Sequence, residues 1–313
     1  MKNFVLAITP SPALDLSGTV DNLKPNEKSY VHDEVKSPGG NAVNAARILS
    51  GLKVPVLATG FLGGSIGDEI KRLLDKEKVK SQFIKIKDDS RICVTVSNTK
   101  DHQQTRLTFP GPHILGSKKK KLFQFVEKQK HTPFLLIGGS MPPGFDHFDI
   151  ALIIKLAKEN GTKCIVDSPG TVLKNLIASE PFFIKPNLVE FQELTRSNVK
   201  SVSGVLKKAQ VFSNKIPYIC ISSVAGGALL VTEQNSYFGR TPKVKIKSTV
   251  GAGDSMVGAM VAQFYKKNTS ADELLRWGLA AAAATLEKPG TAFGSARRIY
   301  QLYEKTKVVA IKK

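Results

Sequence analysis

Short apolar blocks alternate with amphipathic segments along most of the chain. Blocks rich in Val, Ile and Phe, such as FVLAIT and VPVLATGF, are typical of buried strands. The segments between them, such as AVNAARILSGL and DEIKRLLDKE, carry apolar residues at helical spacing. This order predicts a mostly parallel sheet covered by helices. It resumes from PFLLIGGS to ALLVTEQ, and three helical segments follow: SMVGAMVAQFYKK, ADELLRWGLAAAAATL and SARRIYQLYEK.

Two stretches depart from this order. Residues 16–37 and 88–109 alternate apolar and polar side chains with a period of two and contain no helical pattern. We expect them to form a small β-sheet packed beside the main sheet. No repeat, low-complexity segment or linker interrupts the chain, so residues 1–313 are expected to form a single domain.

The composition predicts a soluble, cytoplasmic protein. No run approaches the ~18 apolar residues of a membrane helix, and the apolar start is too short for a secretory signal, so no membrane partner is expected. Cys93, Cys164 and Cys220 lie far apart in strand-like segments and form no metal motif. Buried free thiols in a reducing compartment follow from this spacing.

The chain is strongly basic, with a net charge of +20 from 46 basic and 26 acidic residues. Such a charge attracts polyanions at low salt. The lysines are scattered, however, apart from a run at Lys118–Lys121 that begins a helical segment. This pattern favours solvated surface over a nucleic-acid site. A non-catalytic protein that binds polyanions stays open as an alternative.

The segment STVGAGDSMVGAM places Asp254 at the start of a predicted helix, directly behind Gly251, Ala252 and Gly253. Glycines let successive backbone N–H groups turn toward one point, and the helix adds its positive dipole end. The segment therefore predicts a cradle for an anion. Asp254 is either the N-cap of this helix or a base beside the anion, and spacing alone does not decide between them.

Three further segments place polar groups at the ends of predicted strands or starts of helices. They are GGNAVNAA at 39–46, GGSMPPG at 138–144 and KPNLVE at 185–190. In open α/β sheets ligands bind outside the carboxyl ends of strands, so these segments predict one shared cleft. Taken alone, the first is equally a tight turn, and Glu190 an exposed helix residue. The chain has no Gly-Lys dipeptide, which excludes a P-loop, and no GxGxxG follows the first strand.

Taken in order, these segments resemble the ribokinase-like (PfkB) carbohydrate kinases, and within them the sugar-phosphate kinases. The resemblance runs from ITPSPALDL through SPGGNAVN, GGSMPPG, CIVDSPG and IKPNLVE to STVGAGDSMVGAM, nearly the whole chain. It implies an α/β fold, a three-layer α/β/α sandwich with a small β-sheet lid. In the family this lid often also forms the contact of a homodimer.

The resemblance implies roles for the residues around the nucleotide, ATP. Asp254 matches the base for the acceptor hydroxyl, and the amides of Gly251, Ala252 and Gly253 match the site that neutralises the transferring phosphoryl group. The family's NxxE motif, which organises Mg²⁺ around the phosphates, corresponds to Asn187 and Glu190. Many members also need a monovalent cation such as K⁺. The other residues that match positions at the nucleotide are Lys185, Ser222, Gly227, Ser248 and Thr249.

On the acceptor side, Asp15 matches the aspartate that binds sugar hydroxyls and Arg91 the arginine that contacts the substrate phosphate. A solvated strand charge remains the alternative for Arg91. The resemblance favours phosphorylation of fructose 6-phosphate to fructose 1,6-bisphosphate, as in second-type 6-phosphofructokinases. 1-Phosphofructokinases and tagatose-6-phosphate kinases share every motif, so both activities stay open. The other residues that match acceptor positions are Lys28, Gly39, Gly40, Asn44 and Ser140.

Four positions depart from the family pattern. Val224 stands where relatives have the glycine of an SLG turn, and we expect it to affect nucleotide binding. Asn41 replaces a Gly or Lys, Tyr30 stands where some relatives have a second lid arginine, and Gly139 replaces a Ser. These three positions bear on which sugar is bound rather than on the reaction.

Overall fold

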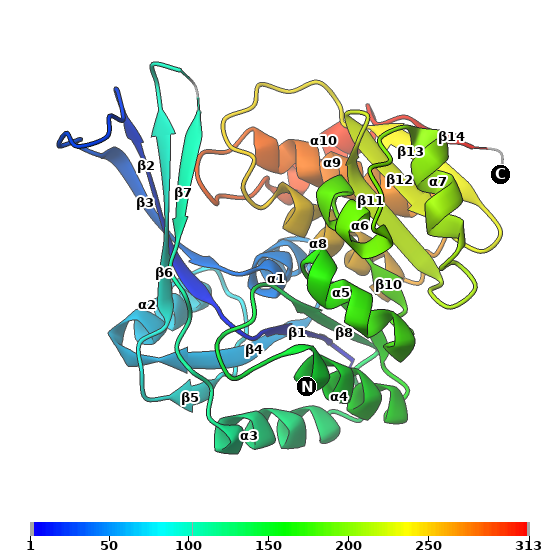
Figure 1. Ribbon diagram of the computed structural model, residues 1–313, viewed down its shortest axis with the longest axis horizontal. Helices are drawn as coiled ribbons and strands as arrows, with labels where there is room; N and C mark the ends of the chain where they lie inside the picture. Colours follow the sequence, from blue (N-terminus) through cyan, green and yellow to red (C-terminus); the bar gives the residue numbers. More distant parts are fainter. Residues whose placement is uncertain (1–2, 102, 312–313) are drawn as a thin grey trace.

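The computed structural model describes residues 3–101 and 103–311 and contains two β-sheets (Figure 1). The larger sheet has ten strands in the order β14-β13-β12-β11-β10-β9-β8-β1-β4-β5. Its parallel part consists of β5 (Ile84–Ile86), β4 (Val56–Gly63), β1 (Val5–Thr9), β8 (Phe134–Gly138), β9 (Lys163–Asp167), β10 (Phe183–Ile184) and β11 (Tyr218–Val224). The antiparallel edge consists of β12 (Gly227–Val231), β13 (Ser236–Arg240) and β14 (Val308–Ala310).

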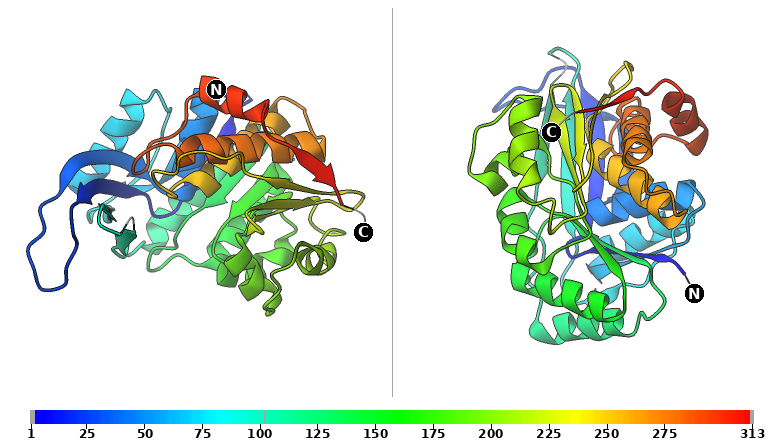
Figure 2. Two further views of the ribbon diagram at one scale, coloured as in Figure 1. Left: turned by 90° about the horizontal axis from the view of Figure 1, so that it is seen from above. Right: turned by 90° about the vertical axis from the view of Figure 1, so that its right-hand side faces the viewer.

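Helices cover both faces of this sheet, which gives three layers (Figure 2, right). One face carries α1 (Asn41–Gly51), α2 (Gly64–Lys76), α8 (Ala252–Tyr265), α9 (Ala271–Leu286) and α10 (Ala296–Tyr303). The other face carries α3 (Gly116–Glu127), α4 (His147–Glu159), α5 (Gly170–Leu176), α6 (Leu188–Thr195) and α7 (Val202–Gln210), and the 3₁₀ turn η1 (Ile177–Ser179) follows α5. The predicted α/β/α sandwich is confirmed.

The hydrophobic core consists of two clusters, one on each face of the large sheet. In β1, Val5 and Ala7 join one cluster while Leu6 and Ile8 join the other, and all four are fully buried. A strand buried on both faces has no polar side, which explains the continuous apolar blocks in the sequence. The cysteines are buried free thiols, as predicted. None of the helices within residues 3–101 and 103–311 has the length and apolar character needed to cross a bilayer.

Small residues bring α1 and α8 close together. A Cβ added to Gly258 of α8 would lie 2.9 Å from the backbone oxygen of Ala45 and 2.9 Å from Cβ of Ile48, both on α1. Only glycine therefore allows this approach. The close packing makes the first turns of the two helices neighbours, and these turns carry Asn44 and Asp254.

The second sheet stands to one side of the sandwich (Figure 1). Its order is β3-β2-β6-β7, with β2 parallel to β6 and antiparallel to β3. The pairing aligns Asp15 with Cys93, and Cys93 with Thr108. The strands are β2 (Ala13–Val20), β3 (His32–Gly39), β6 (Arg91–Asn98) and β7 (Gln104–Thr108), which lie in or next to the two stretches with period-two alternation.

Candidate active site

A pocket of about 650 Å³ lies where the carboxyl ends of the parallel strands meet the four-stranded sheet. The four glycine-rich or polar segments singled out in the sequence all contribute to its lining. Every predicted site residue lines it except Lys28, Gly39 and Ser248. The elements that converge here are far apart in sequence, so the pocket depends on the sandwich fold as a whole.

Gly251 is the N-cap residue of α8, and no side chain caps this helix. Its φ of 77° lies in the left-handed region, and an added Cβ would be 2.8 Å from Cε1 of Phe293, so glycine is required here. The first N–H groups of a helix have no partner within it. Because Gly251, Ala252 and Gly253 line the pocket, the helix end can receive an anion there.

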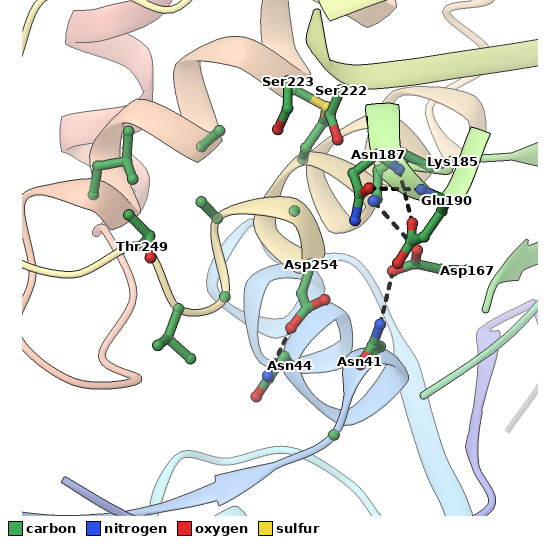
Figure 3. A pocket seen from close by; sticks show the side chains of 18 of the residues that line it. Asn41, Asn44, Asp167, Lys185, Asn187, Glu190, Ser222, Ser223, Thr249 and Asp254 are labelled. Atoms are coloured by element: carbon green, nitrogen blue, oxygen red, sulfur yellow. Dashed lines mark hydrogen bonds and ion pairs between the residues drawn. The ribbon is translucent and has the colours of Figure 1, made fainter. Parts of the chain in front are cut away.

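Asp254 follows as the third residue of α8 and is not the N-cap, so that alternative is wrong. Its Oδ2 accepts a hydrogen bond from Nδ2 of Asn44 at 2.8 Å (Figure 3). Burial and the negative charge of Asp167 raise the pKa of Asp254 to about 7, although Asn44 and Lys185 oppose the shift. A carboxylate with a pKa near neutrality is well suited to accept a proton.

Asp167 and Lys185 form a buried ion pair beside Asp254, with 3.3 Å between Oδ1 and Nζ. The amide of Asn41 donates to the other oxygen, Oδ2, at 3.3 Å (Figure 3). Burial alone would lower the pKa of Lys185, but the surrounding carboxylates, Asp167 first among them, outweigh this effect and raise it. Sequence reasoning assigned Asp167 no role. The available signal was its position at the end of the strand KCIVD.

Asn187 and Glu190 close the N-terminus of α6 as a capping box. Oδ1 of Asn187 accepts from the Glu190 amide at 2.9 Å, and Oε2 of Glu190 accepts from the Asn187 amide at 2.7 Å. Glu190 is half-buried rather than exposed, and burial raises the pKa of its carboxyl. The NxxE spacing is thus also the spacing of a helix cap.

The oxygen-rich lining fits a hard cation. Asp167, Glu190 and Asp254 face the pocket with Lys185 as the cation among them, which leaves an excess of negative charge. Within residues 3–101 and 103–311, no group of three or more His, Cys, Asp and Glu side chains is arranged as a metal cage. Carboxylate and amide oxygens are the ligands that Mg²⁺ prefers, together with waters and phosphate oxygens, and Asn187 and Glu190 could hold it in this way.

The four-stranded sheet contributes Asp15, Arg91 and Arg106 to the other end of the pocket. Nε of the buried Arg91 donates to the backbone oxygen of Ser11 at 3.2 Å. Burial raises the pKa of Asp15 to about 6, against the charges of Arg106, Arg47 and Arg91. Sequence reasoning missed Arg106, because only the pairing of β7 with β6 places it on this face.

The three predicted residues outside the pocket lining have separate surroundings. Gly39 packs on Asp15, and an added Cβ would lie 2.3 Å from Oδ2 of that carboxylate. Ser248 is buried, and its hydroxyl accepts from the Val250 amide at 3.2 Å. Lys28 is exposed in the loop between β2 and β3, with Nζ 5.0 Å from the centre of the Tyr30 ring.

Val224 does not reach the predicted phosphate site. A bulge between Ser222 and Val224 turns the Val224 side chain into the core, where it is fully buried, while Ser223 lines the pocket in its place. Ser223 adopts a left-handed φ of 62° at this bulge. The expectation that Val224 affects nucleotide binding is therefore not supported. Among the other departures, only Asn41 lines the pocket, and Tyr30 is 75% exposed.

Comparison with known proteins connects this geometry to one family. The family model described as pfkB family carbohydrate kinase matches residues 2–297. The chain is 32% identical over 277 residues to a tagatose-6-phosphate kinase of Staphylococcus epidermidis, covering 87% of this chain and 88% of the relative. It is 32% identical over 302 residues to the ATP-dependent 6-phosphofructokinase isozyme 2 of Escherichia coli, and the match covers 96% of this chain and 97% of the relative.

Solved structures of phosphofructokinase-2 from Escherichia coli share the fold. The structure in complex with potassium has a TM-score of 0.90 and 31% sequence identity, covering 97% of this chain and 99% of that chain. The structure in complex with fructose-6-phosphate has a TM-score of 0.89 at 30% identity, with the same coverage. The chain belongs to the pfkB family of carbohydrate kinases and is a sugar-phosphate kinase.

Proposed function

We propose that this kinase transfers the γ-phosphoryl group of ATP to the 1-hydroxyl of fructose 6-phosphate, with Asp254 as the base. The observation that carries the proposal is the position of Asp254, whose carboxylate is held by Asn44 beside the glycine cradle. The cradle can bind the transferring phosphoryl group, and the carboxylate can accept the proton of the hydroxyl. Among the described pocket residues, Asp254 is the carboxylate that lies within the cradle segment itself.

In this proposal the acceptor binds on the side of the four-stranded sheet. Arg91 and Arg106 supply two cations for a substrate phosphate, and Asp15 supplies an acceptor for sugar hydroxyls. The reacting hydroxyl must meet Asp254 while the phosphate meets the arginines. A ketohexose with phosphate on a terminal carbon satisfies both requirements, because its free end then reaches the base.

In this proposal the nucleotide binds on the opposite side of Asp254. Small side chains there leave room for a large ligand, and Lys185 supplies a buried cation toward the phosphates. Magnesium held through Asn187, Glu190 and waters would neutralise phosphate charge when bound. The potassium in the Escherichia coli structure supports a monovalent cation as a further requirement of this chain. The nucleotide side is lined by Ser222, Ser223, Gly226, Gly227, Thr249 and Val250.

During transfer, Asp254 accepts the proton of the acceptor hydroxyl as the oxygen attacks. The N–H groups of the first turn of α8, at Ala252 and Gly253, stabilise the charge on the transferring group. Phosphoryl transfer has a loose transition state, so positioning and electrostatics provide most of the rate. The proton therefore leaves late, so a carboxylate suffices as its acceptor.

Product analysis after incubation with ATP tests the substrate assignment. We expect fructose 6-phosphate to give the highest kcat/KM and tagatose 6-phosphate to react more slowly, because the two differ in one hydroxyl configuration. Fructose 1-phosphate is the second competitor, since it could bind in the reversed sense. A kcat/KM for either competitor more than about tenfold above that for fructose 6-phosphate overturns the assignment and leaves the kinase activity standing.

We also infer a single kinase domain in which the four-stranded sheet is a lid and pairs with a second copy of the chain. Large apolar side chains are exposed on this sheet and its loops, which supports burial in a homodimer. They are Leu23, Tyr30, Val31, Leu107 and Phe109. Light scattering should give twice the monomer mass, and the monomer mass would contradict this inference.

The three free, buried thiols support a cytoplasmic location, because reducing compartments keep thiols free.

A further inference from the structure

Arg47 lies behind the wall of the pocket and connects segments that are far apart in sequence. Its side chain is 6% exposed. Nη1 donates to the backbone oxygen of Pro38 at 3.1 Å, just before the sugar-side glycines, and to that of Thr291 at 3.2 Å. Nε and Nη2 donate to the two carboxylate oxygens of Glu77, each at 2.6 Å. Arg47 is therefore held in one position from several sides.

Phe293 holds the guanidinium from a further side. Cζ of Arg47 lies 4.4 Å from the centre of the Phe293 ring, a cation–π contact. The same ring packs against Gly251, so Arg47 and the cradle share a wall. Glu77 balances the buried positive charge, which would otherwise be costly.

The remaining contact of Arg47 reaches Asn44, one helical turn away. Nη1 has two N–H groups for three acceptors, so it shares one of them between a backbone carbonyl and Oδ1 of Asn44, which lies 3.4 Å away. A guanidinium can only donate hydrogen bonds, whereas a side-chain amide has one accepting end and one donating end. The contact therefore favours the amide orientation that turns the NH₂ group of Asn44 toward Asp254, where Nδ2 donates at 2.8 Å. A flipped amide would set its oxygen against the carboxylate.

We propose that Arg47 is a positioning residue for phosphoryl transfer, because it fixes the amide of Asn44 and through it the carboxylate of Asp254. The inference rests on the proposed role of Asp254 as base. Arg47 does not line the pocket within the described part of the chain, so it acts on the rate without touching either substrate. A displacement of about 1 Å in a reacting group can cost about 10²-fold in rate.

The first test replaces Arg47 by Met, which removes the donors and keeps much of the apolar stem. We expect kcat to fall about 10- to 100-fold, with KM for ATP within about threefold of wild type. Arg47→Lys, which keeps a donor and the charge, should recover part of the loss. A kcat within about threefold of wild type in folded Arg47→Met overturns the proposal.

Arg276 is a matched control. Its Nε donates to the backbone oxygens of Tyr303 and Thr306 at 3.1 Å, Nη1 lies 3.5 Å from Glu273, and its guanidinium stacks on the Tyr303 ring at 4.0 Å. Arg276→Met thus removes contacts of the same kinds, away from the pocket. We expect it to lower Tm and leave kcat unchanged. A kcat loss equal to that of Arg47→Met overturns the positioning role.

Two double variants, together with Asp254→Asn, distinguish a failure of the Arg47 proposal from a failure of the proposed base and from misfolding. In an Asn44→Ala background, Arg47→Met should lower kcat by less than about threefold, because the amide it orients is gone, and an unreduced loss overturns the proposal. Asp254→Asn that keeps wild-type turnover overturns the proposed base instead.

If Arg47→Met does not fold, the double variant Arg47→Met with Glu77→Met leaves no unpaired buried charge. This pair variant must show the same kcat loss, and wild-type kcat in it overturns the proposal.

Discussion

The side-chain amide of Asn44 donates to the carboxylate of Asp254 at 2.8 Å, across 210 residues of sequence. The contact exists because α1 and α8 pack closely at Gly258, which makes their first turns neighbours. One turn supplies an acid beside a cradle for an anion, and the other supplies the amide that holds the acid. The proposed chemistry depends on this pair more than on any single motif.

The pKa of Asp254 makes the rate depend on pH. Burial raises this pKa to about 7, and a protonated carboxyl cannot accept the hydroxyl proton. We therefore expect kcat/KM, which reports the free enzyme, to fall about tenfold per pH unit below this value and to level off above it. Protonation of Asp15, whose pKa is raised to about 6, steepens the fall at lower pH. A flat profile from about pH 5.5 to 8 would contradict the role of Asp254.

Arg91 is expected to recognise the substrate phosphate. Arg91→Ala should cost about 1.5–3 kcal/mol in kcat/KM for fructose 6-phosphate, the size of a lost charged hydrogen bond. Arg106→Ala should act in the same direction, with a smaller loss because Arg106 is more exposed. Free fructose is the control, since it carries no phosphate. Equal losses with both sugars would mean that Arg91 stabilises the fold and does not bind the substrate phosphate.

Local patterns were sufficient to predict most of the sandwich. The helix at Ala271–Leu286 has the bounds of the predicted helical segment, because the helical pattern is continuous from Ser270 onward. The strand at PFFIKPN shrinks to Phe183–Ile184, since the chain turns at Pro186 into α6. The elements that the sequence patterns did not reveal were short, and their stability comes from packing against neighbours. They are α5, α7, the turn η1, the strand β13 and the two edge strands β5 and β14.

The site was predictable only in part, because some of its contacts are set by packing between distant segments and not by local motifs. The motifs that contain Asp254, Asn44 and Glu190 are local, so the sequence displays them. Arg106 and Arg47 carry no such signal, because the pairing of β7 and the packing around α1 decide what they contact. Val224 shows the reverse case, in which a departure from the motif turns away from the pocket.

One substitution can separate the helix cap formed by Glu190 from its proposed role in holding magnesium. Glu190→Gln keeps a residue able to complete the capping box, so Tm should be nearly unchanged. The loss of one negative charge should shift the magnesium dependence of the rate to higher concentration. Titration of the rate with Mg²⁺ at saturating substrates checks this. An unchanged titration would leave Glu190 with the cap as its function.

Val224 is expected to act on stability and not on the nucleotide. Val224→Gly removes a fully buried side chain and should lower the free energy of unfolding by about 2–3 kcal/mol. Urea unfolding measures the loss, and KM for ATP should remain at the wild-type value. An improved KM for ATP in this variant would show that Val224 obstructs the nucleotide after all.

The turnover of Asp254→Asn tests the central claim most directly. The substitution keeps the size of the side chain and the cradle amides but removes the proton acceptor. With ATP binding verified by calorimetry, we expect kcat for fructose 6-phosphate to fall by at least about 10²- to 10⁴-fold while both substrates still bind. Turnover near the wild-type value in a folded, ATP-binding Asp254→Asn would contradict the assignment of Asp254 as the base.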